Sequence, residues 1–151
     1  MRVLVSGGSS GIGAAACLRI AEAALARGVK PMIAVCGHKQ TTSQEEVVRS
    51  IQSMGGTAIA LLGDLGDTNV PGQLVEAAVA EWGGLDALVA NAGIASPGAI
   101  CDLSLEDWDD MFSVNLRGAW LLAKASYAHL KRSRGAACFT SSNWPIINNN
   151  D

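Results

Sequence analysis

The feature that most constrains the fold of this chain is a series of short, continuous apolar runs separated by stretches with a helical pattern. Each run is unbroken rather than alternating with polar residues, which is typical of parallel strands covered on both faces. Strands that alternate with helices predict a three-layer, doubly wound α/β fold with a parallel sheet. The five predicted strands are Arg2–Ser6, Met32–Cys36, Thr57–Leu62, Asp86–Ala90 and Ala136–Thr140.

Four helices are expected to connect the strands, and the longest carries charges that favour its dipole. Acidic residues lie at its start, from Glu106 to Asp110, and basic residues lie at its end, from Lys131 to Arg134. The segment Thr42-Ser43-Gln44-Glu45 matches a capping box that opens the second helix. The expected helices are Gly11–Gly28, Thr42 to about Gly55, Val70–Trp82 and Ser104 to about Ser133.

Composition narrows the classes of function. Hydrophobic residues make up 49% of the chain and charged residues 17%, which excludes a disordered tail and supplies a buried core. The net charge of −3 gives no basic excess for nucleic acid or an anionic membrane. No apolar run approaches the roughly 18 residues of a membrane span. Because the chain opens directly in a strand, we expect no leader peptide.

The four cysteines are scattered, and none forms a CxxC pair. We therefore expect small buried hydrophobic residues rather than metal ligands or disulfide partners. This use of cysteine predicts a reducing, cytoplasmic compartment. The residues concerned are Cys17, Cys36, Cys101 and Cys138.

A glycine-rich segment, Ser6–Gly13, joins the first strand to the first helix. A pyrophosphate needs close approach of the backbone, amide donors and a helix N-terminus, and this segment offers all three. Gly7 allows a tight turn, Gly11 removes a Cβ that would block the phosphates, and Gly13 lets the helix pack closely on the sheet. A tight turn without ligand is the alternative. The predicted cofactor-binding residues here are Gly7, Ser9, Ser10, Gly11, Ile12 and Gly13.

With this G-x-x-x-G-x-G spacing, the chain resembles the short-chain dehydrogenase/reductase family, whose nucleotide-binding sheet is of the Rossmann type. Further segments of the chain are similar to the family's motifs and follow in the same order. The resemblance implies an NAD(P)-dependent oxidoreductase that transfers a hydride between nicotinamide and a carbonyl or alcohol carbon of a small-molecule substrate. The matching segments are Gly63-Asp64-Leu65, Asn91-Ala92-Gly93, Val114-Asn115-Leu116 and Thr140-Ser141-Ser142.

The resemblance implies roles that each have a structural alternative. Asp64, with Leu65, would contact the adenine, or Asp64 would cap the following turn. Asn91 would tie neighbouring strand ends together, with Ala92 and Gly93 beside the cofactor ribose. Alternatively, these three residues form a plain turn.

Asn115 and Ser142 are the predicted catalytic residues. The resemblance implies that Asn115 positions a water for proton relay and that Ser142 binds the reacting oxygen of the substrate. Asn115 shares an apolar helical stripe with Trp108, Phe112 and Leu122, so a buried, hydrogen-bonded Asn is the alternative. For Ser142 the alternative is an ordinary Ser at a strand end.

The family's acid/base is a Tyr with a Lys four residues on, and the resemblance places this pair after Ser142. Only nine residues follow (151 − 142), and none is Tyr or Lys. We therefore expect an incomplete chain with negligible hydride transfer on its own. Tyr127 and Lys131 have the same spacing, but Tyr127 lies about 18 Å beyond Asn115 along a helix axis, so we predict that it is not the base. Turnover that disappears with Tyr127→Phe would contradict this prediction.

The end of the second strand, Val35–Lys39, has no carboxylate to bind a ribose hydroxyl. His38 or Lys39 could instead neutralise a 2′-phosphate, or both are solvated loop residues. We therefore expect NADP as the cofactor, with NAD as the alternative.

The predicted organisation is an incomplete NAD(P)-binding domain at residues 1–142, followed by an irregular, Asn-rich tail at residues 143–151. A non-catalytic dinucleotide-binding or interaction module is the competing function. Because the family often pairs through its long helices, the resemblance also implies a homo-oligomer with Trp120, Leu121 and Tyr127 at its interface. The substrate itself is not specified by these residues.

Overall fold

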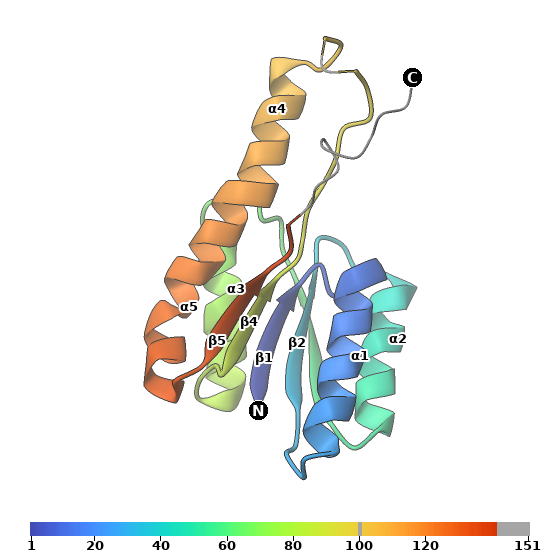
Figure 1. Ribbon diagram of the computed structural model, residues 1–151, viewed down its shortest axis with the longest axis vertical. Coiled ribbons are helices and arrows are strands. Elements are labelled where there is room, and N and C mark those ends of the chain that lie inside the picture. The colour runs from blue at the N-terminus through green and yellow to red at the C-terminus, as the bar shows by residue number, and fades with distance from the viewer. Residues whose placement is uncertain (100, 142–151) are drawn as a thin grey trace.

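The computed structural model describes residues 1–99 and 101–141, so the expected tail and Ser142 lie outside the described residues. Strands and helices alternate along the chain as expected (Figure 1). The elements are β1 (Arg2–Ser6), α1 (Gly11–Leu25), β2 (Met32–Gly37), α2 (Thr42–Ser53), β3 (Thr57–Leu62), α3 (Val70–Trp82), β4 (Ala87–Ala90), α4 (Leu105–Phe112), the π-helical segment η1 (Ser113–Gly118), α5 (Ala119–Ser133) and β5 (Ala136–Phe139).

The described strands form one parallel sheet in the order β3-β2-β1-β4-β5. The chain first builds outward from β1 through β2 to β3, and then returns to place β4 on the other side of β1. The strand order therefore reverses between β1 and β4. In open α/β sheets, ligands bind at the carboxyl ends of the strands at such a reversal.

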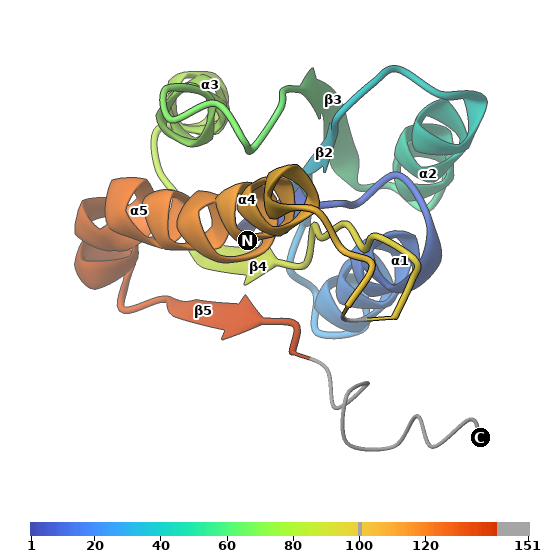
Figure 2. The same cartoon turned by 90° about the horizontal axis from the view of Figure 1, so that it is seen from above.

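Alternate residues of the central strand point to two separate cores. Val3 and Val5 pack in a cluster with Cys17 of α1, whereas Leu4 packs in a cluster with Leu122 of α5. The helices α1 and α2 accordingly lie on one face of the sheet, and α3 and α5 lie on the other (Figure 2). This arrangement confirms the predicted three-layer, doubly wound fold.

Residues 105–133 form one helical rod, but its middle is wound as a π-helix where a uniform α-helix was expected. The predicted start is confirmed, since the Ser104 hydroxyl accepts a hydrogen bond from the Asp107 amide, and the Asp107 carboxylate accepts one from the Ser104 amide. The Ser104 hydroxyl also donates to the Asp107 carboxylate, and this bond, followed by those from the Ser96 hydroxyl and the Ser104 amide, lowers the pKa of Asp107. The rod contains α4, η1 and α5 in succession.

The apolar stripe that Asn115 shares with its neighbours is exposed in the first half of this rod. Trp108 is 50% exposed and Phe112 is 42% exposed, and their rings stack with centroids 4.2 Å apart. The cause is position, because α4 extends beyond the carboxyl edge of the sheet, where no strand lies beneath it (Figure 1). Leu122, farther along the rod, is buried against the sheet as expected.

Strand β5 departs from the expectation that both strand faces are covered. It lies at the edge of the sheet beside β4, and each of its residues is exposed. Cys138 on β5 and Cys101 are exposed too, so the expectation of buried cysteines was wrong for these two. Cys17 and Cys36 are buried, and burial raises the pKa of the Cys17 thiol to about 12. All four thiols are free.

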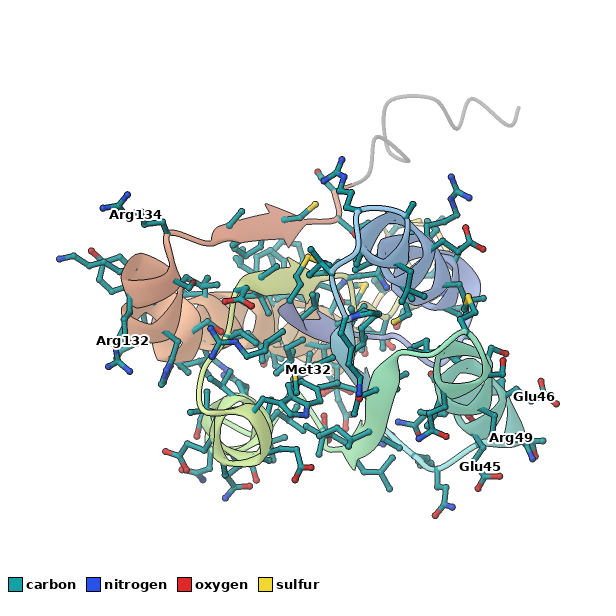
Figure 3. The ribbon with its side chains drawn as sticks, turned by 90° about the horizontal axis from the view of Figure 1, so that it is seen from below. Met32, Glu45, Glu46, Arg49, Arg132 and Arg134 are labelled. Atoms are coloured by element: carbon teal, nitrogen blue, oxygen red, sulfur yellow. The ribbon has the colours of Figure 1, made fainter. Side chains whose placement is uncertain are left out.

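The second helix begins at a different cap from the one expected. Thr41, not Thr42, is the N-cap, and its hydroxyl accepts a hydrogen bond from the Gln44 amide at 3.2 Å. The Gln44 side chain turns into the protein instead of reaching back to the cap. Glu45 and Arg49 point outward from α2 (Figure 3).

At the opposite edge of the sheet from the carboxyl ends, Arg2 and Asp86 form a two-pronged ion pair. The Arg2 Nε donates to Asp86 Oδ2 at 3.1 Å, and Nη2 donates to Oδ1 at 2.6 Å. The Arg2 backbone amide donates to the same carboxylate at 2.8 Å. The pair therefore fastens the start of β1 to the residue before β4, and these hydrogen bonds lower the pKa of Asp86.

We predict that Asp86→Asn destabilises the fold by about 1–3 kcal/mol at neutral pH, because charge-assisted hydrogen bonds are lost. Since the pKa of Asp86 is lower in the folded state, the carboxylate's contribution is complete above the ordinary value of 3.8 and is lost as pH falls through the folded-state value. Unfolding free energies of both proteins across this range should therefore converge at low pH. A difference that does not change with pH would contradict the prediction.

A suitable control is Glu22→Gln, which breaks the exposed Arg19–Glu22 pair. Exposed pairs contribute little, so this variant should unfold much like the parent protein at neutral pH.

Candidate functional site

Neither a membrane span nor a metal centre is found in the part of the chain that the structure describes. Within residues 1–99 and 101–141, no helix is long and apolar enough to cross a bilayer. Among the same residues, no three His, Cys, Asp or Glu side chains are grouped to hold a metal ion. Polar groups gather instead in a cleft at the carboxyl edge of the sheet.

This cleft has a volume of about 1490 Å³ and is built from the loops that follow β1, β2, β3 and β4. Most of the predicted cofactor-binding residues line it. Lys39 and Gly13 are not among its lining residues, and Asn115 lines a neighbouring apolar groove instead. The predicted residues that line the cleft are Gly7, Ser9, Ser10, Gly11, Ile12, His38, Asp64, Leu65, Asn91, Ala92 and Gly93.

The start of α1 lines this cleft with Ser10, Gly11 and Ile12. Its N-cap, Ser10, makes no side-chain capping bond, and no acidic residue lies in the first turn. Gly11 has φ +51, and a Cβ built on it would meet no atom within 4 Å. An uncapped helix N-terminus beside open space suits an anion, so these residues fit the pyrophosphate of a dinucleotide.

Gly7 and Gly13 bring the helix and the turn after β1 into direct contact. Gly7 has φ +65, and a Cβ on it would lie 2.8 Å from Ala92 Cα. A Cβ on Gly13 would lie 2.0 Å from the Gly7 carbonyl oxygen and 2.6 Å from Asn91 Nδ2. The close approach expected of Gly13 is therefore to this turn and to Asn91.

Asn91 links three strands at the point where the strand order reverses. Its Nδ2 donates to the carbonyl oxygens of Ser6 and Gly7 at 3.4 and 3.3 Å, and its Oδ1 accepts from the Thr140 hydroxyl at 3.0 Å. The Ser6 hydroxyl in turn accepts from the Asn91 and Ala92 amides. The predicted tie between strand ends is thus present and joins β1 and β4 to the residue that follows β5.

His38 and Asp64 face each other across the ends of β2 and β3. His38 Nδ1 lies 3.8 Å from Asp64 Oδ1, and both side chains are more than half exposed. Asp64 Oδ1 also accepts from the Gly66 amide at 2.8 Å, so the turn cap is formed while the carboxylate stays open to the cleft. Leu65 is buried in the core, which leaves its backbone to contribute to the cleft.

Asn115 lies in η1 and pairs twice with the backbone of Ile94. Its Oδ1 accepts from the Ile94 amide and its Nδ2 donates to the Ile94 carbonyl, each at 2.8 Å. A Cβ on Gly93 would lie 3.3 Å from Oδ1. The Asn115 side-chain amide therefore has a hydrogen-bond partner, as expected for a polar group in an apolar stripe. The residue itself is exposed, so the alternative of a buried Asn does not hold. Asn115 therefore anchors the loop that follows β4.

Several cleft residues on the long rod were missed by the sequence reasoning. Arg117 and Trp120 line the cleft, and the Arg117 Nη2 donates to the Gly66 carbonyl at 2.8 Å. They follow Val114 at three-residue intervals, a helical spacing that places them on one face. Which loop that face meets depends on how the rod lies on the sheet, which the spacing does not reveal.

Tyr127 lies on α5, away from the cleft. It is 64% exposed and lines neither the cleft nor the groove beside it. Six residues farther along the same helix, the Ser133 hydroxyl donates to the Leu85 carbonyl, just before β4 begins. The helix α5 runs toward the opposite edge of the sheet (Figure 1), and Tyr127 belongs to its second half.

We predict that Gly13→Ala destabilises the protein by about 2–4 kcal/mol, because the new methyl group overlaps the Gly7 carbonyl. Gly72→Ala, in α3, is the matched control, since a Cβ there meets no atom within 4 Å. That variant should be neutral or more stable by about 0.5–1 kcal/mol. Chemical unfolding measures both, and equal effects would refute the proposed contact.

Comparisons with known proteins agree with this geometry. A family model described as short chain dehydrogenase matches residues 1–147. A versicolorin reductase from Emericella nidulans is 39% identical over 140 residues, covering 93% of this chain and 50% of that protein. A probable tetrahydroxynaphthalene reductase from Zymoseptoria tritici is 36% identical over 127 residues, covering 84% of this chain and 45% of that protein.

Solved structures give the same result. A short chain dehydrogenase from Burkholderia cenocepacia, in complex with NADP, matches with TM-score 0.84 and 34% identity over 99% of this chain and 58% of that one. A 3-ketoacyl-ACP reductase from Sinorhizobium meliloti matches with TM-score 0.79 and 36% identity, covering 93% of this chain and 53% of that one. The chain spans about half the length of the curated relatives it matches. With its Rossmann-type sheet and glycine-rich turn, this chain belongs to the short-chain dehydrogenase family.

Proposed function

We propose that this chain is the dinucleotide-binding part of an NADP-dependent oxidoreductase that acts on a carbonyl or alcohol carbon of a small molecule. The observation that carries the proposal is the uncapped N-terminus of α1, which opens on the cleft beside the bare Cα of Gly11. The relatives named above, versicolorin reductase and tetrahydroxynaphthalene reductase, support a reductase. We assign the binding domain to residues 1–142 and leave residues 143–151 outside it.

In this proposal the backbone amides at the start of α1 hold the pyrophosphate, and the hydroxyls of Ser9 and Ser10 donate to it. Asp64 accepts a hydrogen bond from the adenine amino group through the oxygen that Gly66 does not occupy. The segment Asn91-Ala92-Gly93 forms the floor beneath the nicotinamide ribose. The bound nicotinamide supplies or accepts the hydride.

Asn115 and Ser142 act at the reacting end. The pairing of Asn115 with Ile94 supports a role in holding the loop after β4 beside the nicotinamide. Ser142 would donate a hydrogen bond to the substrate oxygen, two residues beyond Thr140, which lines the cleft. The position of Tyr127 supports no role as acid or base, and Tyr127 is the sole tyrosine of the sequence. We therefore expect this chain by itself to bind the cofactor without turning over substrate.

The preference for NADP is inferred from the residues at the end of β2. His38 lines the cleft, and no carboxylate lies between Cys36 and Lys39 to bind the ribose hydroxyls of NAD. A cation at this place stabilises a 2′-phosphate. The NADP bound by the Burkholderia cenocepacia relative supports the same choice.

Calorimetric titration tests the cofactor assignment. The chain should bind NADP more tightly than NAD, and His38→Ala should weaken NADP by roughly threefold to tenfold while leaving NAD unchanged. Lys39→Ala is the control, since Lys39 is not among the residues that line the cleft. Tighter binding of NAD than of NADP would contradict the assignment of NADP. If the folded chain binds neither cofactor, the proposed dinucleotide site is wrong.

The competing function, an interaction module, is favoured by the exposed side of the long rod. Trp120 is exposed, Tyr127 is exposed, and Leu121 lies half-buried beside them. The rod is acidic at its start and basic at its end, so two copies packed antiparallel would bring opposite charges together. We propose a homo-oligomer of this kind, which is compatible with cofactor binding.

For this interface we predict that Tyr127→Glu shifts the chain from dimer to monomer in analytical ultracentrifugation, because a buried carboxylate would lack a partner. Leu62→Glu provides the comparison, since Leu62 is an exposed apolar residue on β3, away from the rod. A parent chain that sediments as a monomer would rule out the interface.

We also propose a reducing, cytoplasmic location. It is supported by the four cysteines, which are all free in the structure.

A further inference from the structure

Gln44 is a completely buried amide at the first turn of α2. Its Nε2 donates to the Val35 carbonyl on β2 at 2.8 Å and to the Leu61 carbonyl on β3 at 3.1 Å. One side chain thus bridges two neighbouring strands close to their carboxyl ends. Its neighbours on the same turn, Glu45 and Glu46, point away from the protein (Figure 3).

Burial of the Gln44 side-chain amide costs free energy that packing alone does not explain. Its Oε1 is buried without a hydrogen-bond partner among the described residues. An unpaired buried acceptor is unfavourable, and an apolar side chain of similar size would avoid it. Such departures from good packing are expected where a residue serves a function.

The position of the bridge connects it to the cleft. A Cβ on Gly37 would lie 3.3 Å from the Gln44 Nε2, so the amide packs directly against Gly37. His38 follows Gly37 on one strand, and Asp64 follows the other strand two residues after Leu62. The Gly63 amide donates to the Gly37 carbonyl, which continues the pairing up to the cleft. The hydrogen bonds from Gln44 to the two strands therefore lie just below His38 and Asp64 and fix the distance between them.

We propose that Gln44 is a positioning residue for the adenosine end of the cofactor. By fixing β2 against β3, it holds His38 beside Asp64, 3.8 Å away, so that His38 meets the 2′-phosphate while Asp64 meets the adenine. Gln44 does not line the cleft, so it acts through these two side chains. The inference rests on the proposed function, because it assumes that His38 meets the 2′-phosphate.

The test compares two amides on the same helix. Gln44→Met removes both donors while keeping the length of the side chain. Gln52→Met is the matched control, because Gln52 Nε2 donates from α2 to the Ala58 carbonyl, at the end of β3 remote from the cleft. Calorimetric titration with NADP and with NAD gives the ratio of the two dissociation constants for each protein. Circular dichroism establishes that each variant is folded.

We expect Gln44→Met to reduce the preference for NADP over NAD by roughly threefold, and by no more than His38→Ala does, because Gln44 acts through that side chain. Gln52→Met should leave the ratio unchanged, even where it lowers stability. If Gln44→Met does not fold, Gln44→Leu serves instead, because it also removes both donors and should lower the ratio in the same direction. In a Gln44→Met, His38→Ala double variant, the two effects on the ratio should not add.

An unchanged ratio in a folded Gln44 variant that still binds the cofactor overturns this inference and leaves the proposed function intact. An equal loss of preference in Gln52→Met overturns it too, because the effect would then be a general consequence of loosening β3. If the unmodified chain binds neither cofactor, the proposed function is wrong, and this inference is wrong with it.

Discussion

The contact between the first turn of α1 and the turn after β1 is the interaction on which the cleft depends. The missing side chain of Gly13 lets the helix meet the Gly7 carbonyl, and the Asn91 amide approaches the same place from β4. This contact fixes where the helix begins, and hence where its unpaired amides point. The neighbouring loops after β2, β3 and β4 then enclose the space in front of those amides.

The sheet and the glycine-rich turn that lines the cleft could be predicted because they depend on local patterns. Buried parallel strands read as apolar runs, and a phosphate-binding turn requires glycine at particular positions. Each predicted strand is present within a residue or two of its expected bounds. The tie made by Asn91 could also be anticipated, since parallel strands bring their carboxyl ends to one edge.

Features that depend on the relative placement of elements could not be predicted in this way. The apolar stripe with Trp108 and Phe112 has helical spacing, but it lies beyond the edge of the sheet and stays exposed. The π-helical turn around Asn115 has no signal in the spacing of its side chains. Gln44 was treated as part of a cap, because nothing in the local pattern shows that two strand carbonyls lie within its reach.

The ion pair between Arg2 and Asp86 stands at one end of the strands, and the cleft stands at the other. Strands of four to six residues separate the two, and no polar side chain described above contacts both. The ion pair therefore contributes to stability at the end of the strands that lies away from the cleft. A descendant of this chain could adapt to a warmer or more acidic habitat at the lower end without altering which coenzyme it accepts at the upper one.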